Sequence, residues 1–159
     1  MDAIQLHLSL NHYPVIALII SIVMLFVGIV GGNKTLVKSA LLITVTVGLV
    51  GIAVYLSGEE AEHIVEGQAG YSEHFLEEHE ELGELAYMAG LILAVFSLAL
   101  FLIEQFTDRS ITLANWLMLV SSLFVLGLFI ITALHGAKIK HDEIRGRVTS
   151  IQFEVPATS

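Results

Sequence analysis

Four long apolar runs, separated by short polar segments, restrict this chain to very few folds. They cover about residues 14–30, 36–56, 82–103 and 111–134. Each run has about the length that an α-helix needs to cross a hydrocarbon core of roughly 30 Å. The runs are unbroken rather than alternating, which argues against membrane β-strands. We therefore predict an all-α integral membrane protein, an antiparallel four-helix bundle over residues 1–147 with a loosely ordered tail at 148–159.

The composition agrees with a membrane protein and excludes several classes of function. Only 14% of the residues are charged, against roughly 25% in soluble domains. The absence of cysteine excludes disulfides, thiolate metal ligands and haem attached through Cys-x-x-Cys-His. A net charge of −9 argues against a nucleic-acid partner, because phosphates are neutralised by Lys and Arg. The lipid bilayer is the partner that the composition predicts.

The segment 57–84 joins the second and third apolar runs and is strongly acidic. It contains ten Glu, three His and no Lys or Arg. We expect helices two and three to extend beyond the membrane here, on one side. The other four histidines fall at the ends of the outer helices that emerge on the same side. Ionisable groups near the membrane interior are costly and generally functional, and Glu59, His79 and His135 lie near its edge. This face is therefore predicted to hold a metal or haem site.

Several side chains of this face are candidate metal ligands. Glu60 and His63 form a Glu-x-x-His pair, a spacing used by di-metal sites in four-helix bundles. Imidazole and carboxylate donors without thiolate suit iron or zinc, and imidazole also suits copper. We predict a mono- or dinuclear centre with a redox or metal-handling role. Its candidate ligands from the residue pattern are His12, Glu59, Glu62, Glu66, His79, Glu80 and His141.

Two other functions also fit the residue pattern. A single b-type haem between His79 and either His135 or His141 would serve electron transfer. Alternatively, the acidic segment docks a cationic partner, and the chain is a non-enzymatic subunit of a membrane complex. Gly48, Gly51 and Gly58 fall on one face of the second helix, where they would let a neighbouring helix approach closely, in a homodimer or in the bundle interior. The acids at 73, 77, 78 and 81, and His74, are each expected to be solvated surface.

The N-terminal residues His7, His12, Tyr13 and Pro14 resemble the His-x4-His-aromatic-Pro opening of a known family. Its members are small bacterial four-helix membrane proteins of unknown function, remotely similar to two-haem b-type membrane cytochromes. The segments 57–62, 72–80 and 135–145 are also similar to stretches of that family. The resemblance implies the four-helix fold. It adds two residues to the candidate metal ligands, His7 and Glu143.

The chain also departs from the two-haem cytochromes. These proteins need axial histidine pairs at two depths of the membrane. The histidines here are expected at one face only, so at most one haem fits without help from a partner.

The charges also bear on orientation. Lys34, Lys38 and Arg109 lie in the turns opposite the histidines. By the positive-inside rule, the acidic, histidine-rich side is then periplasmic or extracellular, in a chain of the cell (inner) membrane. Four basic residues near the C-terminus argue for the opposite orientation, Lys138, Lys140, Arg145 and Arg147.

Overall fold

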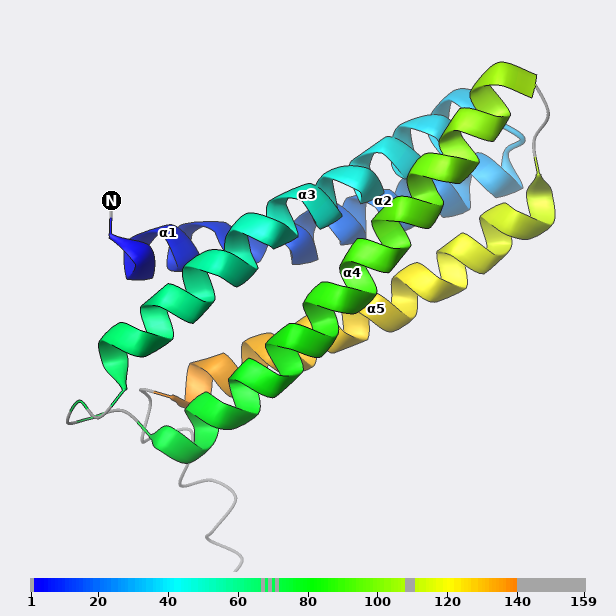
Figure 1. The fold of residues 1–159 in the computed structure, drawn as a ribbon. Coiled ribbons are helices and arrows are strands. Elements are labelled where there is room, and N and C mark those ends of the chain that lie inside the picture. The colour runs from blue at the N-terminus through cyan, green and yellow to red at the C-terminus, as the bar shows by residue number, and fades with distance from the viewer. Residues whose placement is uncertain (1, 67, 69, 71, 108–110, 140–159) are drawn as a thin grey trace, which may run out of the picture.

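The computed structural model describes residues 2–66, 68, 70, 72–107 and 111–139 and is all-α over these residues. Its helices are α1 (Ala3–Leu10), α2 (His12–Val30), α3 (Lys34–Val65), α4 (Glu73–Thr107) and α5 (Thr112–Lys138). α1 and α2 follow each other as the first arm of an antiparallel four-helix bundle, and α3, α4 and α5 are the other arms (Figure 1). The predicted fold class is therefore confirmed.

All four arms are long and apolar enough to cross a membrane. The predicted spans lie within them, except that α5 begins one residue later than predicted, at Thr112. Large apolar side chains on the outside of the bundle are exposed, as expected of a surface that faces lipid. Examples are Ile16, Leu49, Val95 and Phe124. The chain is a multi-pass membrane protein in contact with the bilayer. The predicted tail at 148–159 lies outside the described residues.

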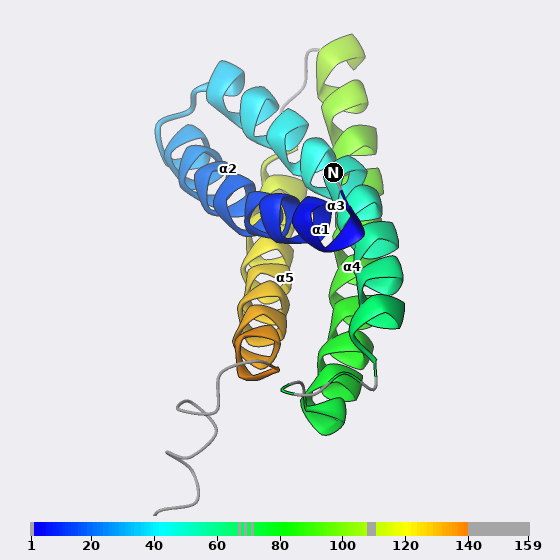
Figure 2. The same ribbon diagram turned by 90° about the vertical axis from the view of Figure 1, so that its left-hand side faces the viewer.

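The first arm is interrupted at Asn11, and Pro14 explains the break. Proline has no N–H, so Pro14 cannot donate to the carbonyl of Leu10, and its ring crowds that carbonyl. The helix before the break, α1, is capped by Asp2, whose side chain accepts a hydrogen bond from the Gln5 N–H (2.8 Å). α1 packs mainly against α3 and crosses it in Figure 2. It is this short helix that carries His7.

Small residues let the helices approach closely at the centre of the bundle. A Cβ added to Gly48 in α3 would lie 2.4 Å from the Cβ of Ala94 in α4. The predicted glycine face of this helix is confirmed, since Gly51 faces Tyr87 and Gly58 faces His7. Buried hydroxyl groups also link the arms. Ser21 donates to the Ala40 carbonyl (2.8 Å) and Ser97 to the Leu41 carbonyl (2.9 Å).

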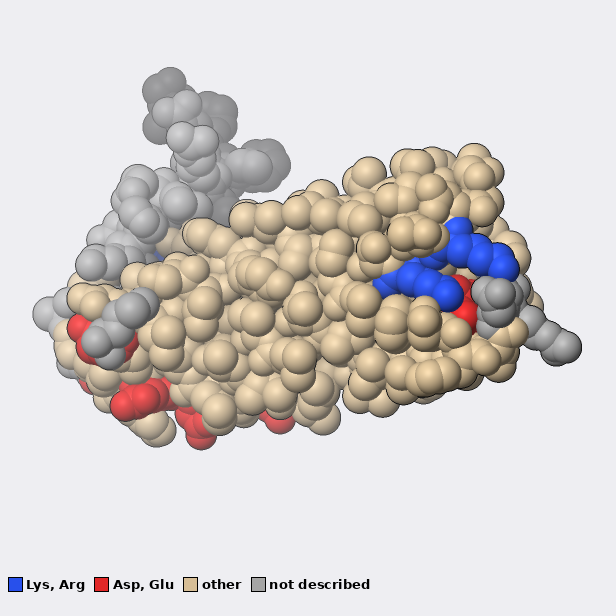
Figure 3. Space-filling model, turned by 90° about the horizontal axis from the view of Figure 1, so that it is seen from above, with Lys and Arg blue, Asp and Glu red and all other residues tan. Residues whose placement is uncertain are grey.

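The two ends of the bundle differ in charge. The acidic ends of α3 and α4, at 57–65 and 73–81, lie at the same end as α1 and the C-terminal end of α5 (Figure 1). On the face drawn in Figure 3, carboxylates gather near this end and lysines near the other. The six described histidines all belong to helix ends on the acidic side. These are His7, His12, His63, His74, His79 and His135. Their predicted one-sidedness is confirmed, and His141 lies outside the described residues.

Candidate functional site

Two histidines from different arms meet at the acidic end of the bundle. His7 belongs to α1 and His79 to α4. Their ring centres are 6.3 Å apart and their planes stand at 89° to each other. Both side chains are half-buried. His79 therefore points into the bundle.

The His7 ring is held by α3. Its Nδ1 lies 3.0 Å from the carbonyl oxygen of Val54. One helical turn later, Gly58 leaves room for the ring, because a Cβ at this position would lie 3.0 Å from both Cε1 and Nδ1 of His7.

The His79 ring is held by α5 in the same way. Its Nδ1 lies 2.9 Å from the carbonyl oxygen of Thr132. Gly136 is again four residues after the residue that supplies the carbonyl. A Cβ on Gly136 would lie 2.9 Å from Cε1 of His79 and 3.1 Å from its Nδ1. Two unrelated helices thus use one arrangement, a carbonyl at position i and a glycine at position i+4.

These hydrogen bonds determine the form of the two imidazoles. A carbonyl oxygen only accepts, so Nδ1 of each ring carries the hydrogen and donates it. In the neutral ring, Nε2 then keeps its lone pair. Metal-bound histidines usually show this pattern, in which the second nitrogen donates to a carbonyl or a carboxylate. No described residue forms a hydrogen bond with Nε2 of His7 or His79.

The surroundings of His79, which precedes the apolar part of α4, also favour its neutral form. Burial lowers the pKa of His79 below its usual value of 6.5, and the nearby His7 and His135 lower it further. The hydrogen bond to Thr132 acts in the opposite direction without overcoming the burial. A buried imidazole loses hydration that its charged form needs. His79 is therefore available as a nitrogen donor near neutral pH.

The ring separation indicates how two such donors would share a metal ion. Metal–imidazole bonds are about 2.0 Å long, and each nitrogen is about 1.2 Å from its own ring centre. Two ligands on opposite sides of one ion would then have ring centres about 6.4 Å apart, and two at a tetrahedral angle about 5.2 Å apart. At 6.3 Å, the rings of His7 and His79 are close enough for both to reach one ion.

Within the described ranges, no group of three or more His, Asp or Glu side chains is arranged to hold a metal ion. The predicted ligand set therefore does not converge as a whole. His141 and Glu143 lie outside the described residues. Glu59, Glu66 and His12 are exposed. Of the candidates, the structure brings together His7 with His79, and Glu62 with Glu80.

Glu62 of α3 and Glu80 of α4 form a carboxyl pair at the same end of the bundle. Both lie beyond the apolar parts of their helices. Partial burial and the adjacent Glu80 raise the pKa of Glu62 from 4.5 to about 7. Two carboxylates that share a site cannot both ionise easily, so one retains a proton that bonds to the other. His63 acts in the opposite direction and Glu66 adds to the rise.

A second cluster joins α4 to α5 and includes two residues that the sequence predicted to be solvated surface, His74 and Glu78. Glu78 lies between two imidazoles, with His74 Nε2 3.5 Å from its Oε1 and His135 Nε2 3.7 Å from its Oε2. His135 also directs Nδ1 to the Ile131 carbonyl of its own helix (3.0 Å). His135 thus faces Glu78, while His79 is paired with His7.

The hydrophobic pattern of the sequence does not reveal how the rings of His7 and His79 are held. One other feature of the sequence does bear on it. The carbonyl-bearing residues and the glycines are spaced alike, as Val54-x3-Gly58 and Thr132-x3-Gly136. No periodicity could show which carbonyl each ring reaches, since the pairs 7–54 and 79–132 are distant in sequence.

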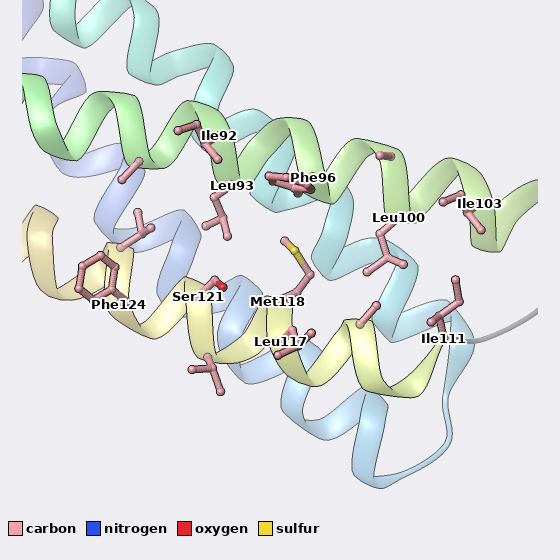
Figure 4. A pocket seen from close by; sticks show the side chains of 15 residues that line it. Ile92, Leu93, Phe96, Leu100, Ile103, Ile111, Leu117, Met118, Ser121 and Phe124 are labelled. Atoms are coloured by element: carbon pink, nitrogen blue, oxygen red, sulfur yellow. The ribbon is translucent and has the colours of Figure 1, made fainter.

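The chain also has an apolar hollow of about 880 Å³ between α4 and α5 (Figure 4). Its lining runs from Ala89 to Ile103 on α4 and from Ile111, just before α5, to Val125 on α5. Ser121 is the hydroxyl-bearing member of that lining. The hollow lies within the apolar spans, away from the histidine pair, and its lining contains no His, Asp or Glu.

Comparison with known proteins adds no assignment. No family model, no curated protein and no solved structure matches this chain. Any function proposed for the chain therefore rests on its own geometry.

Proposed function

We propose that this chain is a membrane redox protein that binds a metal centre between His7 and His79. The observation that carries the proposal is the pair of rings, 6.3 Å apart, each with Nδ1 bonded to a backbone carbonyl. Both Nε2 atoms are thereby available as donors. The role that suits such a centre is one-electron transfer within or beside a membrane complex.

The donor set favours haem b over a bare ion. A zinc or non-haem iron site takes three or four ligands from the protein. Haem iron takes four nitrogens from the porphyrin and needs only two axial ligands. His7 and His79 would supply two nitrogen donors, one from each of two arms of the bundle. When bound, haem would supply a reversible change between ferric and ferrous iron.

The residues of the chain would have distinct tasks in such a protein. His7 and His79 bind, and the carbonyls of Val54 and Thr132 keep their Nε2 atoms free of hydrogen. Placement at the membrane boundary favours exchange of electrons with a partner on the acidic side. A cationic surface on that partner would complement the glutamates at 57–84.

A His/Glu ion site is the second candidate, supported by the contact between Glu62 and Glu80. These carboxylates, together with His79, offer oxygen and nitrogen donors to iron, zinc or copper. Adoption of such a site requires side-chain rotations that bring the three groups together. The non-enzymatic docking subunit is the third candidate and predicts no tightly bound metal.

We place the acidic side in the periplasm or outside the cell. The support is the position of Lys34 and Lys38 at the opposite end, which the positive-inside rule assigns to the cytoplasm. A second copy of the chain is a further candidate partner, because glycine-bearing helix faces favour close helix pairs in membranes.

The decisive experiment measures metal content and absorption on one detergent-purified sample, expressed with ample haem and iron. Wild type is compared with His7→Ala and His79→Ala. His12→Ala is the matched control, because His12 is exposed on a neighbouring helix turn. The proposal predicts near-stoichiometric haem in wild type and in His12→Ala, and loss of haem in the other two variants.

Each other outcome has a clear meaning. If metal is bound without a Soret band, and the metal content falls in Glu62→Ala and His79→Ala, the centre is the His/Glu ion site and not haem. A metal content well below one per chain, even after supplementation with iron, zinc and copper, would refute both the haem site and the His/Glu ion site. The docking subunit would then be the remaining candidate.

A further inference from the structure

We infer that Gly58 and Gly136 are positioning residues that hold the imidazole planes of His7 and His79 nearly perpendicular. The inference rests on the proposed haem ligation. It goes beyond that ligation by assigning a task to two residues that would not themselves be ligands.

Each imidazole is fixed at two points. One is the hydrogen bond from Nδ1 to a carbonyl, and the other is contact of the ring edge with a glycine one turn later. In a helix, the side chain at position i+4 lies over the carbonyl of residue i. A glycine at i+4 therefore exposes that carbonyl. Added Cβ atoms would lie 3.0 Å from His7 and 2.9 Å from His79, so each ring would have to rotate or withdraw.

The two anchors are independent of each other. His7 is oriented by α3, through Val54 and Gly58, and His79 by α5, through Thr132 and Gly136. The angle of 89° between the ring planes is thus a consequence of how α3 and α5 are placed in the bundle. A change at one glycine should alter one ring and leave the other in position.

Perpendicular axial imidazoles have a spectroscopic signature. Each imidazole donates preferentially into the iron d orbital perpendicular to its plane. With perpendicular planes the two orbitals stay nearly equal in energy, and ferric low-spin haem shows one strongly shifted low-field EPR line. With parallel planes the orbitals separate, and the spectrum becomes a resolved rhombic set of three lines.

The test is EPR of the ferric holoprotein, with absorption spectra and circular dichroism of the same samples. It compares wild type, Gly58→Ala and Gly136→Ala. Gly127→Ala is the matched control, since Gly127 is also in α5 and a Cβ there would meet nothing within 4 Å. We expect the shifted line in wild type and in Gly127→Ala. In the other two variants we expect the line to move towards the rhombic pattern, with helix content unchanged.

The outcomes separate this inference from the proposed function. A wild type without haem would overturn both. A rhombic spectrum in haem-bound wild type would overturn the inference and leave the ligation intact. An unchanged line in both Gly58→Ala and Gly136→Ala would show that the glycines do not position the rings. If one glycine variant fails to fold, the other still tests its own ring, because the two anchors are independent.

Discussion

His7 and His79 lie on helices that do not pack closely against each other, yet their rings stand 6.3 Å apart at 89°. The contact arises because each ring is hydrogen-bonded to a further helix, a different one for each ring. α3 holds His7 through Val54, and α5 holds His79 through Thr132. The relative position of the rings therefore depends on the whole bundle rather than on a local motif.

The first prediction concerns shared ligation by these two histidines. If one haem iron is bound by both, His7→Ala alone and His79→Ala alone should each remove most of the haem. The double variant should then lose little more, because residues that act as one unit are strongly non-additive. Haem per chain, from the pyridine haemochrome spectrum, is the measurement. Two separate partial losses that add in the double variant would contradict a shared iron.

The fold could be predicted from the sequence because its main cause is simple. Runs such as 82–103 are predominantly apolar and long enough to span the bilayer, where a helix satisfies its own backbone. The spacing of Gly48, Gly51 and Gly58 on one helical face likewise indicated close helix contact. The break at Asn11 follows from Pro14, although the continuation of helical structure back to Ala3 was not predicted.

The candidate site was predicted only in part. Its end of the bundle, and His79 as a member, followed from the one-sided histidines. His7 entered through family resemblance, and its pairing with His79 was not foreseen. The carbonyl of Val54 carries no side-chain signal, and the rings meet through the tertiary placement of α1 on α3. At Glu78 the sequence indicated ordinary acidic surface, and only the packing of α5 on α4 brings His135 beside it.

The second prediction concerns the carboxyl pair of Glu62 and Glu80. The pKa of Glu62 is raised to about 7 in the folded protein from a usual value of 4.5. Because the pKa is raised, the folded state binds more protons than the unfolded state at pH values between 4.5 and about 7. The contribution of the Glu62 carboxyl group to stability is therefore fully present below about pH 4.5 and is lost as the pH rises through about 7. Glu62→Gln, which cannot ionise, should remove this loss.

The measurement is Tm in detergent from about pH 5 to about pH 8. We expect wild type to lose stability over this interval and Glu62→Gln to lose less. Glu60→Gln is the control, because Glu60 is an exposed neighbour on the same helix. Equal slopes in wild type and Glu62→Gln would show that the pair does not govern the pH dependence.

The third prediction concerns the close approach of α3 and α4. Gly48→Ala would place a Cβ 2.4 Å from the Cβ of Ala94, so the helices must separate. Overpacking of this kind costs about 1–3 kcal/mol of unfolding free energy. Gly127→Ala, with open space around it, should be neutral or slightly stabilising. Unfolding in mixed micelles measures both. Equal stability of the two variants would argue against close packing at Gly48.

The last prediction concerns Glu104, a buried carboxylate at the end opposite the histidines. It is 1% exposed, and its Oε1 accepts hydrogen bonds from the Ile111 N–H and the Asn115 side chain, each 2.8 Å. Glu104→Ala leaves both donors unpaired, and a buried unpaired donor costs about 1–3 kcal/mol. Glu104→Gln keeps an acceptor of the same size and should lose less. Unfolding free energies of the two variants provide the measurement. If alanine and glutamine were equally well tolerated, the start of α5 would not depend on these bonds.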